Sequence, residues 1–425
     1  MRLVSTLTGA GICTGMLMAL SAPANAAVDA KLLQMLRANG SISQAQYTEL
    51  QAELTADQQA QAAQQQATAQ QVAEMKAKRD ELSSFEQKVA WAAKTQIKGD
   101  VRVRYEDVQA DGSSDNNRNR VRARVGFYSE INPQVDAGVR IATGGGDRRS
   151  TNQTFDNYFS QKDVWVDMAY LDWHPTAVKN LHLIGGKMPQ PWVNEGDIIW
   201  DGDINPEGFA ATYKLPLGNT GAELFGSAGY FTLKKNVDGD GNEFNHDLSM
   251  YIGQIGTRFA IIDGLKATFG GSVYSFDGDN SDAARAALGV YGNTDTQFRL
   301  YEGFGQLDMT NLPIPLSAYG QYVVNDDATN DQDTAYLVGL KTKVGKFGLD
   351  YNYRDVQRNA VVSAFTDSDF ANGYVASRGH KIKGSYEIDK NFGLGVTYFI
   401  AETDGSPAGN NIDVNTLQLD LEAKF

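Results

Sequence analysis

The chain has 425 residues and a formal net charge of −14, with 43 Gly, 19 Tyr, 19 Phe and a single Cys. Its mean hydropathy of −0.39 argues against a helical membrane protein, because a helix that crosses a bilayer needs about 20 consecutive, mostly apolar residues. The acidic balance argues against nucleic acid as a partner. The only cysteine, Cys13, lies in a segment that we expect to be removed, which leaves no disulfide, thiolate metal site or cysteine nucleophile.

Residues 1–26 have the layout of a secretory signal peptide. Arg2 precedes a short apolar stretch at residues 7–20, and Ala24-Asn25-Ala26 follows it. A positive start, a short apolar region and a small-residue cleavage site are typical of such a signal, which predicts a cut after Ala26. An exported, acidic, disulfide-free chain suits the envelope of a Gram-negative bacterium.

Residues 27–95 are rich in Ala and Gln and predict a helical arm in the periplasm. Apolar residues at helical spacing predict two short amphipathic helices, near residues 32–36 and 47–54, with Asn39-Gly40-Ser41 as the turn between them. Later apolar residues recur at coiled-coil spacing, namely Val72, Met75, Leu82 and Val89. Charged residues at the intervening seam positions weaken this heptad pattern. The arm is therefore either an oligomerisation or cell-wall-contacting element or a flexible helical spacer.

From residue 96 onward the sequence follows a period of two, most clearly in the last stretch, residues 414–425. One side of an extended chain there carries only apolar residues, namely Leu417, Leu419, Leu421, Ala423 and Phe425. The other side is polar and charged. This alternation is typical of a membrane-barrel strand with one face to lipid and one to an aqueous lumen, although an edge strand of a soluble sandwich also alternates. We expect the terminal Phe425 to be the signal read by the barrel assembly machinery.

About 16 candidate strands follow the same pattern, and their connections alternate in length. The long connections lie near residues 109–118, 143–161, 188–206, 234–245, 277–295, 325–333, 357–376 and 403–413. The short ones include Asn132-Pro133, Ile262-Asp263-Gly264 and Gly345-Lys346. Outer-membrane barrels have long external loops and short periplasmic turns. The sequence therefore predicts an all-β transmembrane barrel of antiparallel strands over residues 96–425, closed so that no strand edge is left unpaired.

Six segments in order resemble the putative porin family of Gram-negative outer membranes: RNRVRARVG (residues 118–126), GVRIATG (138–144), STNQTFDNYFS (150–160), AYLDWHP (169–175), GGKMPQPW (185–192) and WDGDINPEG (200–208). The resemblance covers residues 96–425 and is strongest up to residue 233. It implies a signal peptide, a periplasmic helical arm and a diffusion barrel in the outer membrane, in contact with lipid and lipopolysaccharide. By analogy with general porins it implies a homotrimer. It does not identify a solute.

Six arginines fall on the polar side of the first three predicted strands: Arg102, Arg104, Arg120, Arg122, Arg124 and Arg140. On the lipid side near the midplane each would cost about 2–4 kcal/mol, which places them in the lumen. They form either a basic pore wall or a set of ion pairs with lumen carboxylates such as Asp100.

The third long connection, residues 188–206, is too apolar for a loop in water, since it contains Trp192, Ile198, Ile199 and Trp200. It also carries or precedes five acids, namely Glu195, Asp197, Asp201, Asp203 and Glu207. In general porins the third external loop folds into the barrel. We expect the aromatic residues here to pack on the wall and the acids to face the channel, so that acids and arginines set a transverse field. The alternative is a loop packed on the rim.

Other candidate sites are weak. Asp238, Asp240 and Asn242 resemble the start of a calcium loop, but the twelfth position is Ser249 and the flanks are predicted strands. The four histidines are His174, His182, His246 and His380, and none has metal-ligand spacing or a nucleophile motif. Arg148 and Arg149 are expected either to attract lipopolysaccharide phosphates or simply to be solvated. The sequence thus predicts no enzyme, metal or cofactor.

These observations predict an outer-membrane porin for passive diffusion of small hydrophilic or ionic solutes through a water-filled channel. The alternative is a structural barrel that tethers the outer membrane to the cell wall through its N-terminal arm.

Overall fold

The computed structural model describes residues 30–218, 221–237, 247–294, 296–404 and 411–425. The predicted signal peptide and the segment from Asp238 to Asn242 lie outside these residues. The chain divides into two compact units, Met1–Val89 and Ala90–Phe425.

The first unit contains the helix α1 (Ala30–Ala38) and most of α2 (Gln44–Ala93). Ser43 and Gln46 form a capping box at the start of α2: the Ser43 hydroxyl accepts from the Gln46 N–H at 3.3 Å, and the Gln46 side chain accepts from the Ser43 N–H at 3.0 Å. The prediction of a short second helix is wrong, because α2 runs for 50 residues. Ala, Gln, Glu and Lys are strong helix formers, and neither Gly nor Pro interrupts residues 44–93. None of the described helices is long and apolar enough to cross a membrane.

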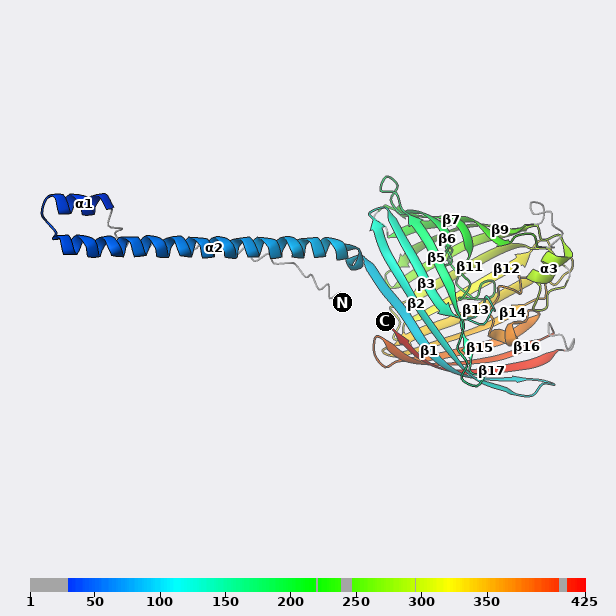
Figure 1. The fold of residues 1–425 in the computed structure, drawn as a ribbon. Coiled ribbons are helices and arrows are strands. Elements are labelled where there is room, and N and C mark those ends of the chain that lie inside the picture. Colours follow the sequence, from blue (N-terminus) through cyan, green and yellow to red (C-terminus); the bar gives the residue numbers. More distant parts are fainter. Residues whose placement is uncertain (1–29, 219–220, 238–246, 295, 405–410) are drawn as a thin grey trace. The chain divides into compact units, whose positions relative to one another are not determined.

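The second unit is a closed antiparallel β-barrel (Figure 1). The wall strands are β1 (Thr95–Ala110), β2 (Asn116–Asn132), β3 (Val135–Thr143), β5 (Val164–Trp173), β6 (Leu181–Lys187), β7 (Glu207–Leu217), β8 (Ala222–Lys234), β9 (Leu248–Ile262), β10 (Leu265–Asp277), β11 (Arg299–Met309), β12 (Leu316–Asn325), β13 (Thr334–Val344), β14 (Phe347–Val356), β15 (Ser377–Glu387), β16 (Phe392–Thr403) and β17 (Ile412–Lys424). Each pairs with its neighbours in the chain, and β17 pairs with β1 to close the ring. The prediction of a closed antiparallel barrel is confirmed.

The alternation read from the sequence separates the two faces of the wall. On β1, Val101 and Val103 are exposed on the outside, whereas Arg104 and Glu106 are buried on the inside. Strand β5 alternates poorly for an identifiable reason. Its pairing with β3 shifts at Asp167, where a bulge inserts one extra residue and reverses the faces.

Several long connections fold into the barrel. We number them in chain order: loop 2 is residues 144–163, loop 3 is 188–206, loop 5 is 278–298 and loop 7 is 357–376. Loop 2 contains the two-residue strand β4 (Gln153–Thr154), which pairs with Arg120 and Val121 of β2. Loop 5 contains α3 (Asp282–Leu288), and loop 7 contains a 3-10 turn, η1 (Phe370–Gly373).

The barrel interior has two different halves. One apolar cluster joins loops 3, 5 and 7 to the inner faces of β7–β14, and its wall residues include Ala210, Phe231, Met250, Tyr274, Leu300, Val323, Leu337 and Val356. The facing strands β15–β17 and β1–β3 form what we call the polar wall, with inner residues that include Lys381, Thr397, Asp420, Asp100, Arg104, Arg122 and Arg140. Loops 3, 5 and 7 thus place most of their buried apolar side chains on one half of the barrel, and the other half keeps a polar, charged face.

Candidate functional site

Loops 3 and 7 pack together as one body inside the barrel. The ring of Phe365 in loop 7 stacks on Trp200 of loop 3 at 5.4 Å, and Trp192 meets Phe231 of β8 edge-on at 5.7 Å. Backbone bonds join the loops as well, since the Asp201 N–H donates to the Phe365 carbonyl at 2.7 Å. Loop 3 therefore lies inside the barrel with its aromatic residues packed on the apolar half.

Loop 7 is a long connection between β14 and β15, as the sequence predicts, but its burial inside the barrel was not predicted. Its residues Val361, Val362 and Phe365 are at most 5% exposed. Arg149 of loop 2 donates to the carbonyls of Ser363 and Gly373, both at 3.1 Å, and its guanidinium lies 3.5 Å from the centre of the Tyr291 ring. Arg149 is thus buried and holds loops together, so neither the solvated nor the lipid-binding expectation describes it.

The far end of loop 7 reaches the opposite wall. Phe370 of η1 packs edge-on against Phe399 of β16 at 6.1 Å. One step earlier in the chain, Asp369 accepts from Arg104 of β1 at 3.0 Å. Loop 7 therefore spans the interior from the apolar half to the polar wall.

Asp197 of loop 3 is held by two cations. It lies 2.5 Å from both Arg354 of β14 and Lys381 of β15. Although burial alone would raise the pKa of Asp197, these two charges hold it below its ordinary value. Arg354 also pairs with Asp367 of loop 7 at 3.2 Å, so one buried arginine ties both loops to the wall.

Asp201 of loop 3 lies near other carboxylates, whereas Asp197 lies near cations. It is buried, and burial together with the carboxylates of Asp367 and Asp203 raises its pKa well above the ordinary value. Its two oxygens accept from the N–H groups of Asp203 and Ser368, both at 2.9 Å. Asp201 joins the loops and does not face the wall cations.

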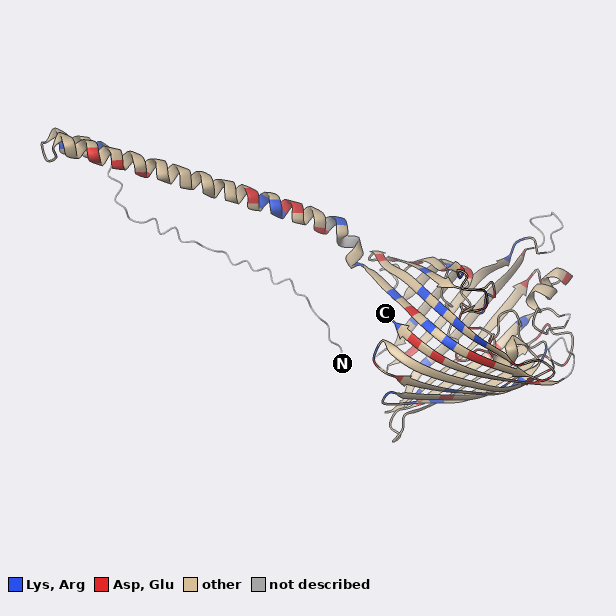
Figure 2. Ribbon diagram, turned by 60° about the horizontal axis from the view of Figure 1, so that its bottom comes forward, with Lys and Arg blue, Asp and Glu red and all other residues tan. Residues whose placement is uncertain are grey.

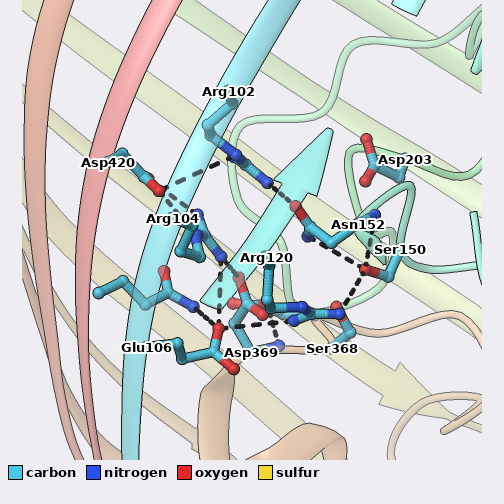
Figure 3. Close-up of polar contacts among 12 residues, drawn as sticks. Arg102, Arg104, Glu106, Arg120, Ser150, Asn152, Asp203, Ser368, Asp369 and Asp420 are labelled. Atoms are coloured by element: carbon cyan, nitrogen blue, oxygen red, sulfur yellow. Dashed lines mark hydrogen bonds and ion pairs between the residues drawn. The ribbon is translucent and has the colours of Figure 1, made fainter. Parts of the chain in front are cut away.

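The arginines of the polar wall are paired with carboxylates from the same wall and from the loops (Figure 3). Arg104 makes a two-pronged contact with Asp420 of β17 at 2.7 and 2.9 Å. Arg122 and Arg124 share Asp100, with Nε–oxygen distances of 2.8 and 2.7 Å. Figure 2 shows basic and acidic residues interleaved on neighbouring strands beside the C-terminus. The wall is therefore a network of ion pairs and not a uniformly basic surface.

The loop acids meet this network at two places. Asp203 lies 3.2 Å from Arg124 and accepts from the Thr151 N–H and hydroxyl at 3.0 and 2.9 Å. Asp369 meets Arg104, as described above. The structure thus brings Asp203 of the predicted loop set against the predicted arginines, and it adds Asp369, which sequence reasoning missed.

Other predicted residues lie apart. Arg140 pairs with Asp167 of β5. Glu207 begins β7 and pairs with Lys187 at 2.8 Å, with its side chain 64% exposed. Glu195 lines a small cavity of about 200 Å³ together with Asp197 and the lysines Lys341, Lys381 and Lys383.

Two further predicted features sit at the edges of the barrel. Phe425 exchanges two backbone hydrogen bonds of 3.0 Å with Gly99 of β1, and its ring covers Gly99, where an added Cβ would lie 2.6 Å from the ring. His182 lies 2.8 Å from Asp172. Among the described residues, no group of three or more potential metal ligands is present.

The burial of loop 7 could have been predicted from its composition. The run from Ala360 to Phe365 is as apolar as the segment that identified loop 3. An apolar run of this kind within a long connection predicts burial, because Val, Phe and Ala are among the residues most often buried.

The fold is that of solved porins. The barrel is similar to OmpF of Salmonella typhi in complex with daunomycin, at 14% identity, covering 78% of this chain and 97% of that chain, with a TM-score of 0.50. It is also similar to OprB of Pseudomonas putida at high pH, at 12% identity, covering 81% of this chain and 97% of that chain, with a TM-score of 0.51.

The sequence is also similar over a short segment to a known protein, and it matches a protein family. A 32-residue segment, 8% of this chain, is 78% identical to phosphate starvation-inducible protein 1 of Pseudomonas fluorescens and covers 82% of that protein. The family described as putative porins matches residues 108–302 and 303–425, and the chain belongs to this family.

Proposed function

We propose that this porin-family barrel forms a water-filled channel in the outer membrane for passive diffusion of small hydrophilic or ionic solutes. The observation that carries the proposal is the division of the barrel interior. Loops 3, 5 and 7 fill the apolar half, and the polar wall is left facing their charged edges. Water and ions need a path lined by charges and dipoles, and a barrel of this size has room for one.

The constriction of this channel is proposed to lie beside two ion pairs, in which the loop acids Asp369 and Asp203 contact the wall arginines Arg104 and Arg124. The acids come from the loops and the arginines from the wall, so both signs of charge border the passage there. Such an arrangement sets a field across the passage, which orients dipolar solutes and discriminates ions by charge.

The remaining assignments follow from the same proposal. Residues 1–26 direct export, the arm at residues 27–95 lies in the periplasm, and three copies assemble in the membrane in contact with lipid and lipopolysaccharide. Phe425 is the assembly signal. The name of the Pseudomonas fluorescens relative supports induction during phosphate limitation.

Single-channel conductance of the refolded full chain in a planar bilayer tests the proposal. A steady conductance is expected, and the reversal potential under a salt gradient gives the ion preference. A protein that is folded and inserted but does not conduct would refute the channel.

The tether is the second candidate, and one observation favours it: α2 extends for 50 residues, and its described side chains are almost all exposed after residue 54. A polar helix of this length gains little by folding alone and fits a partner surface. Deletion of residues 27–94 separates the candidates. A channel keeps its conductance after the deletion, whereas a tether loses envelope integrity while the barrel stays folded.

A further inference from the structure

The first two strands place arginines directly opposite each other. In the β1–β2 register, Arg102 faces Arg122 and Arg104 faces Arg120. Like charges opposite each other across two strands destabilise the pairing unless other groups offset them. Each of these four guanidinium groups therefore needs nearby carboxylates or other hydrogen-bond acceptors to offset the repulsion.

Two of the four arginines, Arg104 and Arg122, have close carboxylate partners. Arg104 holds Asp420 with two hydrogen bonds and Asp369 with a third. Arg122 holds Asp100 at 2.8 Å and lies 2.7 Å from Glu422. These two arginines have their charge and their N–H groups matched by nearby carboxylates.

Arg102 and Arg120 are not matched in this way. The contact of Arg102 with Asp420 is 3.9 Å long, and its one hydrogen bond goes to the neutral Asn152 at 2.7 Å. Arg120 lies 3.5 Å from Glu106, which also pairs with Arg104 and Arg118, and it donates to the Ser150 hydroxyl at 3.4 Å. Among the residues that the structure describes, both Nε atoms are buried without a hydrogen-bond partner.

Loop 2 supplies neutral polar groups between these two arginines (Figure 3). Asn152 donates to the Ser150 hydroxyl at 3.1 Å, and Asn152 is 7% exposed. A serine hydroxyl that accepts hydrogen bonds can still donate its own hydrogen. Arg102, Arg120, Asn152 and Ser150 thus form one connected group with surplus donors.

We propose that this group is a weak binding site for oxyanions, which takes the phosphate or carboxylate group of a solute in transit. A planar guanidinium presents parallel N–H donors that match the oxygens of both groups. An oxyanion in contact with Arg102 and Arg120 would bring a counter-charge and further acceptors to two guanidinium groups whose carboxylate contacts are 3.9 and 3.5 Å long. The inference rests on the proposed channel and names the class of solute that it favours.

The surrounding carboxylates set the strength of the site. Glu106, Asp369 and Asp420 lie around it and repel an anion, so binding is driven by the unmatched donors and not by a net positive charge. A transport site must release its solute as readily as it admits it. Weak, roughly millimolar binding is therefore the expected behaviour.

The test measures chloride conductance of the full chain in a bilayer while inorganic phosphate or acetate is added in separate titrations. Each oxyanion that binds is expected to reduce the current in a saturable way. Arg102→Gln and Arg120→Gln are each expected to weaken that effect at least about tenfold, which corresponds to the loss of one hydrogen bond to a charged group. Arg102→Lys keeps the charge without the planar fork and is expected to recover only part of it.

Arg258→Gln is the matched control, since Arg258 of β9 pairs with Glu223 at 3.4 Å, outside the proposed group. Isothermal titration calorimetry of the folded protein in detergent, with inorganic phosphate and with acetate, is the second measurement. Block by one of the two anions alone assigns the site to phosphate or to carboxylate.

The outcomes separate the two proposals. A conducting barrel that neither anion blocks or binds overturns the site and leaves the channel. Equal anion binding by Arg102→Gln, Arg120→Gln and Arg258→Gln also overturns the site. A folded barrel that does not conduct overturns the channel, and calorimetry then decides on the oxyanion site by itself.

Discussion

Truncation of one aromatic ring in loop 7 tests whether the inward loops narrow the barrel. Phe365 is 5% exposed and stacks between Trp200 at 5.4 Å and Phe276 at 6.4 Å. Replacing a buried Phe by Ala costs about 3–5 kcal/mol, through lost burial and the cavity that remains. Because the wall strands are held by hydrogen bonds to one another, Phe365→Ala is expected to weaken the packing of the loops and leave the barrel intact.

A loss of this size favours released loops by a factor of roughly 100 or more. The expected result is a larger and noisier single-channel conductance and faster protease cleavage within loop 7. Phe159→Ala is the matched control, because Phe159 in loop 2 is fully exposed. If Phe365→Ala folds into the barrel, as judged by heat-modifiable migration on gels, and both conductance and cleavage match those of Phe159→Ala, the loops do not narrow the passage.

Three further predictions concern the charges of loops 3 and 7. Arg354→Gln leaves the buried carboxylate of Asp197 without one of its two cations and is expected to destabilise the inward-packed loops by about 3 kcal/mol. The loss should appear as faster protease cleavage of loop 7. The double variant with Asp197→Asn should recover most of this loss, and no recovery would contradict the pairing. Asp369→Asn removes a carboxylate that faces Arg104 and is expected to shift the reversal potential toward anions, whereas an unchanged potential would place Asp369 outside the passage. The raised pKa of Asp201 means that its contribution to loop seating is complete below the ordinary aspartate range and is lost as pH rises through the raised value. Amide exchange of loop 7, corrected for intrinsic rates, should therefore quicken with pH. Asp201→Asn should reduce that dependence, and the part that remains is assigned to Asp367, whose pKa burial also raises.

The strands and the burial of the apolar residues in loop 3 could be predicted because each depends on local pattern. Alternation assigns Val101 and Arg104 to opposite faces without any knowledge of neighbours, and the apolar segment of loop 3 signals burial by its composition. The bulge at Asp167 was not predictable, because it arises from pairing with β3 and interrupts the local pattern. The same holds for the pairing of Arg104 with Asp420, which lie 316 positions apart.

Charged side chains favour one register where β17 pairs with β1 to close the barrel. Across β1 and β17, Asp100 faces Lys424, Arg102 faces Glu422, Arg104 faces Asp420 and Glu106 faces Gln418. A slip of two residues in one direction would set Arg102 against Lys424 and Glu106 against Asp420. A slip in the other direction would set Asp100 against Glu422, and a slip of one residue would turn apolar side chains inward. Among these alignments of β1 with β17, the observed one is therefore the one that keeps the two faces of the wall and sets no like charges opposite each other.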